Sequence, residues 1–268
     1  MSTANLLVEL FVEELPPKAL KKLGESFATV LADSLKAQGL ATADAVVTPF
    51  ASPRRLAVHV TSVAPKAADQ AVQQKLMPVS VALDANGQAT PALLKKLSAL
   101  GLGVEVVPQL KRAPDGKAEA LFLDSIKPGA ALAEGLQKAL EESLAKLPIP
   151  KVMTYQLEQG EGADFQPGWT SVNFVRPAHG LVALHGEQEV PLSVLGLKSG
   201  RATQGHRFEA RVSPVILKPA ATYAEQLQHE GAVIASFAER RAEIARQLNA
   251  AAAKAGSGLH PSEDEALL

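Results

Sequence analysis

Apolar residues recur along this chain with the spacings of strands and of amphipathic helices. Continuous or alternating apolar runs predict strands at residues 6–12, 56–61, 181–184, 190–197 and 215–217. Leucines three to four residues apart predict helices at 18–38, 93–100 and 132–147. Strands and helices do not alternate regularly, so the pattern favours an α+β fold with mixed or antiparallel sheets and packed helices.

Turn residues divide these elements, and near Lys218 the pattern changes from mixed strands and helices to helices alone. The segments 104–110 and 120–126 flank Pro114-Asp115-Gly116-Lys117, which predicts a hairpin. Beyond Pro219 the pattern is helical, over 220–229 and 233–255, and we expect the second helix to turn four apolar residues inward: Ile234, Phe237, Ile244 and Leu248. We therefore expect an α+β module at 1–217 and a helical segment at 218–268. In strand 56–61, His59 is expected to face solvent.

Composition narrows the class of protein. The longest apolar runs fall well short of the roughly 20 residues of a membrane span, which argues against a membrane role. No basic segment precedes the run at 6–12, so no signal peptide is expected, and the chain has no cysteine. Both features favour the cytoplasm. The formal net charge of -1 means that any contact with nucleic acid must be local.

The usual catalytic motifs are absent. The sequence has no phosphate-binding loop of the Gly-x-x-x-x-Gly-Lys-Ser/Thr type and no Gly-x-Gly-x-x-Gly fingerprint. The six histidines never show the spacing of a helical zinc site, and no serine lies in a Gly-x-Ser-x-Gly elbow. Glu13 and Glu14 are interpreted as acidic residues that interact favourably with the dipole of the helix that follows, rather than as a general base. We therefore expect no catalytic residue, no metal ligand and no cofactor in this chain.

Cationic side chains beside proline and glycine are the most informative feature. They flank turns and strand ends, so their charged heads are presented from fixed backbone positions, as an anionic partner such as RNA requires. The candidate RNA-binding residues are Arg54, Arg55, Lys151, Arg176, His179, Arg201, His206 and Arg207. We expect Gly205 to permit a tight turn and Phe208 to anchor it in the core. The alternative is that the arginines bridge loops and that His179 is a core histidine.

Five short segments, taken together and in order, resemble one family. They are Glu13-Glu14-Leu15-Pro16-Pro17-Lys18-Ala19-Leu20, Ser52-Pro53-Arg54-Arg55-Leu56-Ala57, Leu147-Pro148-Ile149-Pro150-Lys151, Phe174-Val175-Arg176-Pro177-Ala178-His179 and Gly205-His206-Arg207-Phe208. The ordered set is similar to the β subunit of the bacterial two-subunit glycyl-tRNA synthetase, and the similarity covers nearly the whole chain. Two places depart from that family: Phe11-Val12 stands where Gly-Thr is usual, and Val152 to Gln156 where an Arg-Trp-Gly motif is usual.

The resemblance implies a subunit of an enzyme rather than a complete one. In this family the α subunit activates glycine with ATP and Mg, and the β subunit supplies recognition of tRNA(Gly) within an α2β2 assembly. The chain would then be an N-terminal fragment, inactive alone, that leads into a longer C-terminal part. Its fold would be similar to the B3/B4 module of the phenylalanyl-tRNA synthetase β subunit.

Two functions remain open under this resemblance. The first is a noncatalytic region for RNA binding and assembly. The second is a hydrolase module that edits mischarged aminoacyl-tRNA, with His179 or His206 positioning a water molecule. The first is favoured, because no pair of nucleophile and base stands out in the sequence.

Overall fold

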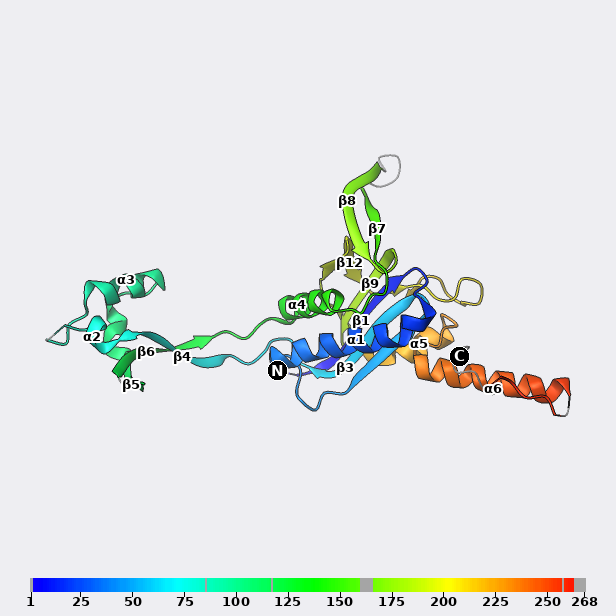
Figure 1. The fold of residues 1–268 in the computed structure, drawn as a ribbon, viewed down its shortest axis with the longest axis horizontal. Helices are drawn as coiled ribbons and strands as arrows, with labels where there is room; N and C mark the ends of the chain where they lie inside the picture. Colours follow the sequence, from blue (N-terminus) through cyan, green and yellow to red (C-terminus); the bar gives the residue numbers. More distant parts are fainter. Residues whose placement is uncertain (1, 85, 117, 160–165, 257, 263–268) are drawn as a thin grey trace. The chain divides into compact units, whose positions relative to one another are not determined.

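A computed structural model describes residues 2–84, 86–116, 118–159, 166–256 and 258–262. It confirms the α+β class, with helices packed on mainly antiparallel sheets (Figure 1). Contacts divide the chain into two units: the first comprises Met1–Ala67 and Ala130–Leu268, and the second comprises Ala68–Gly129. The sequence did not indicate this second unit. The expected boundary after Leu217 falls inside the first unit and stays a prediction.

The main sheet of the first unit is built around β1 (Ala4–Val12). It pairs in antiparallel fashion with β3 (Arg55–Val63) and β9 (Ala178–His185). The strand order in this sheet is β11-β12-β9-β1-β3-β2, and β10 also pairs with β9. The β12–β9 pair is parallel. The remaining strands of this sheet are β2 (Val47–Ser52), β10 (Gln188–Glu189), β11 (Ser193–Val194) and β12 (Leu197–Gly200).

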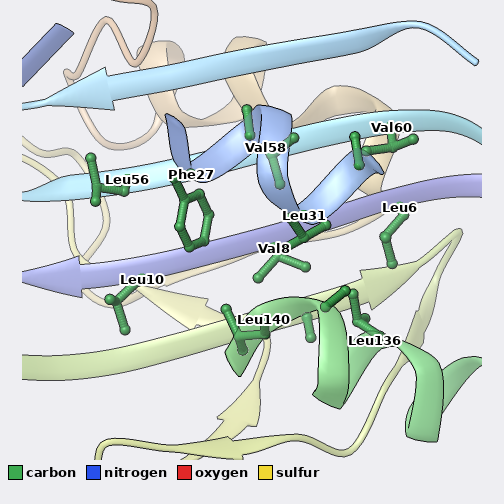
Figure 2. Packing of buried hydrophobic residues seen from close by; sticks show 14 of the residues in the cluster. Leu6, Val8, Leu10, Phe27, Leu31, Leu56, Val58, Val60, Leu136 and Leu140 are labelled. Carbon is green, nitrogen blue, oxygen red and sulfur yellow. The ribbon is translucent and has the colours of Figure 1, made fainter. Parts of the chain in front are cut away.

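Two helices cover one face of this sheet. Even-numbered apolar residues of β1 point toward α1 (Pro17–Ala37) and α4 (Leu132–Ala145), and Figure 2 shows the side chains that meet there: Leu6, Val8, Leu10, Phe27, Leu31, Leu136 and Leu140. All of them are fully buried. Burying each such side chain contributes about 1.5–3 kcal/mol, which makes this layer the main source of stability in the unit.

The second face of the sheet is buried as well. Leu7 of β1 belongs to a cluster with residues of α5 (Tyr223–His229), including Tyr223 and Leu227. Burial on both faces explains why β1 is a continuous apolar run instead of an alternating one.

The remaining elements of the first unit are short strands and a hairpin. The segments that lead into α5 are β13 (Ala202–Thr203), β14 (Val215–Ile216) and the 3-10 helix η3 (Ala220–Thr222). A separate hairpin is formed by β7 (Met153–Gln159) and β8 (Gln166–Phe174).

The second unit is a three-stranded antiparallel sheet with short helices. Its strand order is β4-β6-β5, with β4 (Gln70–Pro78), β5 (Lys111–Asp115) and β6 (Ala118–Lys127). The helices are α2 (Val79–Ala82), α3 (Pro91–Ala99) and the 3-10 helix η1 (Val104–Gln109). The strand predicted at 104–110 is therefore wrong. Residues 104–109 form the 3-10 helix, with Pro108 inside it, and residues 111–115 pair with β6 instead.

The last helix also differs from its prediction. α6 (Phe237–Ala255) begins at Phe237, because Ser236 caps it by accepting a hydrogen bond from the Glu239 amide at 3.3 Å. It contains no buried residue among those described, and Ile244 and Leu248 are 41% and 44% exposed. Of the four residues expected to face inward, Phe237 packs against the main core cluster, whereas Ile244 and Leu248 are uncovered. None of the helices in the described ranges is both long and apolar enough to cross a bilayer.

His59 does not face solvent as expected. It lies on β3 opposite Leu7 and Thr48, on the face that carries the second buried cluster. Its Nε2 atom is buried without a hydrogen-bond partner in the described structure, and burial lowers the pKa of the imidazole from its ordinary value of 6.5.

This burial predicts a loss of stability in acid. The unfolded chain takes up a proton near pH 6.5, whereas folded His59 takes it up only at lower pH. The contribution of His59 is therefore fully present above that value and falls as the pH drops through the folded pKa. Chemical denaturation at pH 7.5, 6 and 5 should show a smaller acid loss in His59→Leu than in the native chain. An unchanged pH dependence would contradict this explanation.

Candidate nucleic-acid interface

A cavity of about 490 Å³ lies in the first unit. Three segments meet around it: the β2–β3 turn, residues 205–208, and residues 232–240, which lead into α6. Four of the eight candidate residues from the sequence line it: Arg54, Arg55, His206 and Arg207. Arg240 lines it too and was not among the candidates. Its lining as described holds four arginines and a single carboxylate, that of Glu14, so it is suited to an anion.

A buried ion pair supports the inner wall of this cavity. Arg55 and Glu9 are 2% and 1% exposed, and Arg55 Nε lies 3.4 Å from Glu9 Oε2. Glu9 also accepts hydrogen bonds from the Thr203 and Tyr223 hydroxyls, and burial together with the charge of Glu9 raises the pKa of Tyr223 well above its ordinary value. Arg55 Nη2 donates to the carbonyl of Gln204. The network thus joins β1 and β3 to the segment that precedes Gly205.

Arg54 is held at the mouth of the same turn. Its Nη2 donates to Glu13 Oε1 at 3.0 Å, and its guanidinium lies 5.0 Å from the ring centroid of Phe11. The same carboxylate oxygen lies 2.9 Å from His179 Nε2. Glu13 therefore ties the end of β1 to the β2–β3 turn and to the start of β9, and the charge of Arg54 is partly compensated.

The segment 205–212 is fixed by backbone contacts to residues 230 and 231. The His206 amide donates to the Gly231 carbonyl at 2.6 Å, and the Arg211 amide donates to the Glu230 carbonyl at 2.8 Å. A Cβ on Gly205 would lie 2.6 Å from that Gly231 oxygen and 2.7 Å from Gly231 Cα. Gly205 is thus required by a close approach of two backbones, rather than by the turn conformation that we expected.

We predict that Gly205→Ala destabilises the chain. The added methyl group must displace backbone atoms, which typically costs about 1–3 kcal/mol of unfolding free energy. Gly200→Ala is the matched control, because a Cβ there meets no atom within 4 Å. Urea denaturation of the two variants should show a lower midpoint for Gly205→Ala alone. Equal midpoints would contradict the close approach.

His206 and Phe208 present an aromatic surface at the cavity. The expectation that Phe208 anchors the turn in the core is wrong: its side chain is 82% exposed, because the turn is held by the Gly205–Gly231 approach instead. His206 Nδ1 accepts from the amides of Phe208 and Glu209, at 3.3 and 3.2 Å. A neutral ring in this arrangement carries its proton on Nε2, which leaves that N–H as a donor for a ligand.

Two of the lining arginines have no carboxylate partner among the residues that the structure describes. Arg207 is exposed, and within the described structure its guanidinium has no ion pair or hydrogen bond. Arg240 Nη1 donates only to backbone carbonyls, those of Ala51 at 2.8 Å and Ile234 at 3.4 Å, and burial lowers the pKa of its guanidinium. An anion in the cavity would compensate both charges, and it would offset the cost of partly burying Arg240.

The other four candidates lie away from the cavity lining. Arg176 donates to the carbonyls of Glu14 and Val175, at 2.8 and 2.9 Å, and Arg201 donates to Glu189 Oε1 at 2.6 Å. His179 is the partner of Glu13, and Lys151 is exposed. Arg176 and His179 meet at the adjacent residues Glu14 and Glu13. The assignment of all four as RNA-binding residues stays a prediction.

Comparison with known proteins agrees with the resemblance carried by the five ordered segments of the sequence. The model of a family described as "Glycyl-tRNA synthetase beta subunit" matches residues 6–268. The chain belongs to this family. Among its relatives are proteins named "Glycine--tRNA ligase beta subunit" from Paracidovorax citrulli, 70% identical over 269 residues, and Leptothrix cholodnii, 72% identical over 268 residues. Each alignment covers 100% of this chain but only 38% and 36% of those proteins. The resemblance stated from the sequence is confirmed.

Proposed function

We propose that this chain is a noncatalytic tRNA-binding and assembly region of a glycine–tRNA ligase β subunit. The observation that carries the proposal is the cavity at which Arg54, His206, Arg207 and Arg240 converge in a chain of this family. RNA presents phosphates at every nucleotide, and an arginine guanidinium binds them through two parallel hydrogen bonds. To such a ligand the cavity offers two guanidinium groups that, in the described part of the chain, have no carboxylate partner.

The remaining parts of the proposal concern the whole enzyme. The α subunit would bind ATP and Mg and attach glycine, while this region helps to hold tRNA(Gly) in a cytoplasmic α2β2 assembly. The chain alone would form no glycyl-adenylate. Glycine-dependent exchange of pyrophosphate into ATP by the purified chain, with α subunit excluded, would contradict this division of labour.

Steady-state kinetics of the α–β assembly test the tRNA-binding role. Arg207→Ala should raise the KM for tRNA(Gly) by about 10-fold, the worth of one hydrogen bond to a charged group, while the KM values for glycine and ATP stay unchanged. Arg207→Lys should also raise the KM for tRNA(Gly), but by a smaller factor, because an ammonium group keeps the charge and cannot form two parallel bonds.

Arg211→Ala is the matched control for these kinetics. It removes the same exposed charge four residues away, from a side chain that does not line the cavity. An increase in the KM for tRNA that is equal for Arg207→Ala and Arg211→Ala would point to a diffuse charge effect. Kinetic constants equal to those of the native enzyme for every Arg207 variant would reject the proposed site.

The geometry gives less support to an editing hydrolase. The histidine with a carboxylate partner is His179, paired with Glu13, and neither lines the cavity. The histidine that does line it, His206, uses Nδ1 to accept backbone hydrogen bonds, so this nitrogen is not free to take a proton from water. Deacylation of alanyl- or seryl-tRNA(Gly) by the assembly, abolished in His206→Ala, would favour editing over the noncatalytic role.

A further inference from the structure

The exposed ring of Phe208 is the feature that phosphate binding does not explain. It lines the cavity beside His206, with the two rings edge to face and their centroids 6.2 Å apart. Phe208 is 82% exposed, so it buries little apolar area and contributes little to stability through burial. In proteins that bind single-stranded RNA, such a ring serves as a platform on which a base stacks.

Two kinds of lining residue matter for the choice of ligand, beside Ser52 and the single carboxylate of Glu14. Apolar side chains come from Pro53, Val233 and Ile234, and cationic ones from Arg207 and Arg240. A nucleotide has the same two parts, because its base is a flat apolar surface with polar edges and its phosphate is an anion. The volume of about 490 Å³ lies within the range of roughly 300–1,000 Å³ that is typical of small-ligand pockets.

We infer that this cavity takes one unstacked nucleotide of the bound RNA, with its base against Phe208 and its phosphate at Arg207 and Arg240. The inference rests on the proposed tRNA-binding function and adds the part of the RNA that is recognised. The His206 Nε2–H group provides a donor for an acceptor on the edge of the base. A paired base within a duplex cannot reach the ring, so the nucleotide comes from a loop, a bulge or an end.

The first experiment varies the ring in the α–β assembly. Phe208→Trp keeps a stacking surface and should bind tRNA(Gly) about as well as the native protein. Phe208→Leu keeps an apolar side chain but has no π face, and its affinity should fall by about 5- to 150-fold, the range for loss of one stacked base. Because Phe208 is exposed, none of these variants should lower the midpoint of thermal unfolding.

The second experiment removes the base instead of the ring. A series of tRNA(Gly) molecules carries one abasic ribose in turn at each unpaired position. One of them should lose as much affinity as Phe208→Leu, and combining the two changes should cost little more than either alone, because they remove the same contact. If no abasic position is coupled to Phe208→Leu, the inference is overturned.

The outcomes separate this inference from the proposed function. Weaker binding by Arg207→Ala, together with native affinity in Phe208→Leu, would keep the RNA-binding role and reject the nucleotide site. Native affinity in both variants would reject both. A change in the fluorescence of the indole introduced by Phe208→Trp with AMP or GMP, but none with tRNA(Gly), would assign the cavity to a free nucleotide and also overturn the inference.

Discussion

Replacing Arg55 by alanine is expected to lower the free energy of unfolding by about 3–5 kcal/mol. The substitution leaves the Glu9 carboxylate, which is 1% exposed, without its cation. It also removes the donor to the Gln204 carbonyl, so that residues 205–208 lose a contact to β3. Denaturant unfolding of the chain measures the effect. Although Arg55 lines the cavity, the main effect of its substitution should therefore be a loss of stability.

Arg54→Ala is the matched comparison for this prediction. Arg54 is the preceding residue and also forms an ion pair, but the side chains of Arg54 and Glu13 are 26% and 38% exposed. Pairs in such positions contribute about 0–1 kcal/mol, because water screens both charges. An Arg55→Ala variant no less stable than Arg54→Ala would show that the buried pair is not the support that we describe.

A second large effect is expected on the salt dependence of tRNA binding. Each arginine that neutralises a phosphate releases counterions, and this contributes about 0.7–0.9 to the slope of log affinity against log salt concentration. Replacing Arg207 and Arg240 together by glutamine should therefore flatten the slope by about one and a half. Affinity at low salt should fall by at least ~10-fold. Titrations of the α–β assembly with tRNA(Gly) at several salt concentrations measure both values.

Arg246→Gln provides the control for the slope. This arginine lies on α6 and pairs with Glu243 at 2.6 Å, so its charge is already compensated. The variant should bind with the native slope. A slope that stays native in the Arg207 and Arg240 double variant would mean that these guanidinium groups do not contact phosphates.

Local patterns were sufficient for the elements that form the main core. β1, α1 and α4 were predicted because each has a long run of apolar residues at a strand or helix period, and each buries them. The second unit was missed because β4 pairs with a strand about fifty residues away, so that no short turn joins the two strands directly. Ile244 and Leu248 of α6, which are uncovered, show the opposite limit, because a helical period indicates a face but not what packs on it.

The candidate site was predicted only in part, because local features can be read from the sequence and contacts between distant segments cannot. Arg54, Arg55, His206 and Arg207 stand within two residues of a proline or glycine, a local feature that marks a turn. Arg240 has no such neighbour, and it reaches the cavity because the Ala51 amide donates to the Ala235 carbonyl at 3.1 Å, a contact between distant segments. Glu9 could have been noticed as the one charge in an apolar strand, but its partners Arg55, Thr203 and Tyr223 are brought together only by folding.

Site-specific crosslinking tests the central claim most directly. A photoreactive phenylalanine analogue placed at Phe208 in the α–β assembly reports whether tRNA(Gly) lies at the cavity. The control position is Val46, which is 60% exposed and adjoins the opposite end of β2 from the cavity turn. We predict an RNA crosslink at position 208 and none at position 46. No crosslink at position 208, or equal yields at the two positions, would contradict the account.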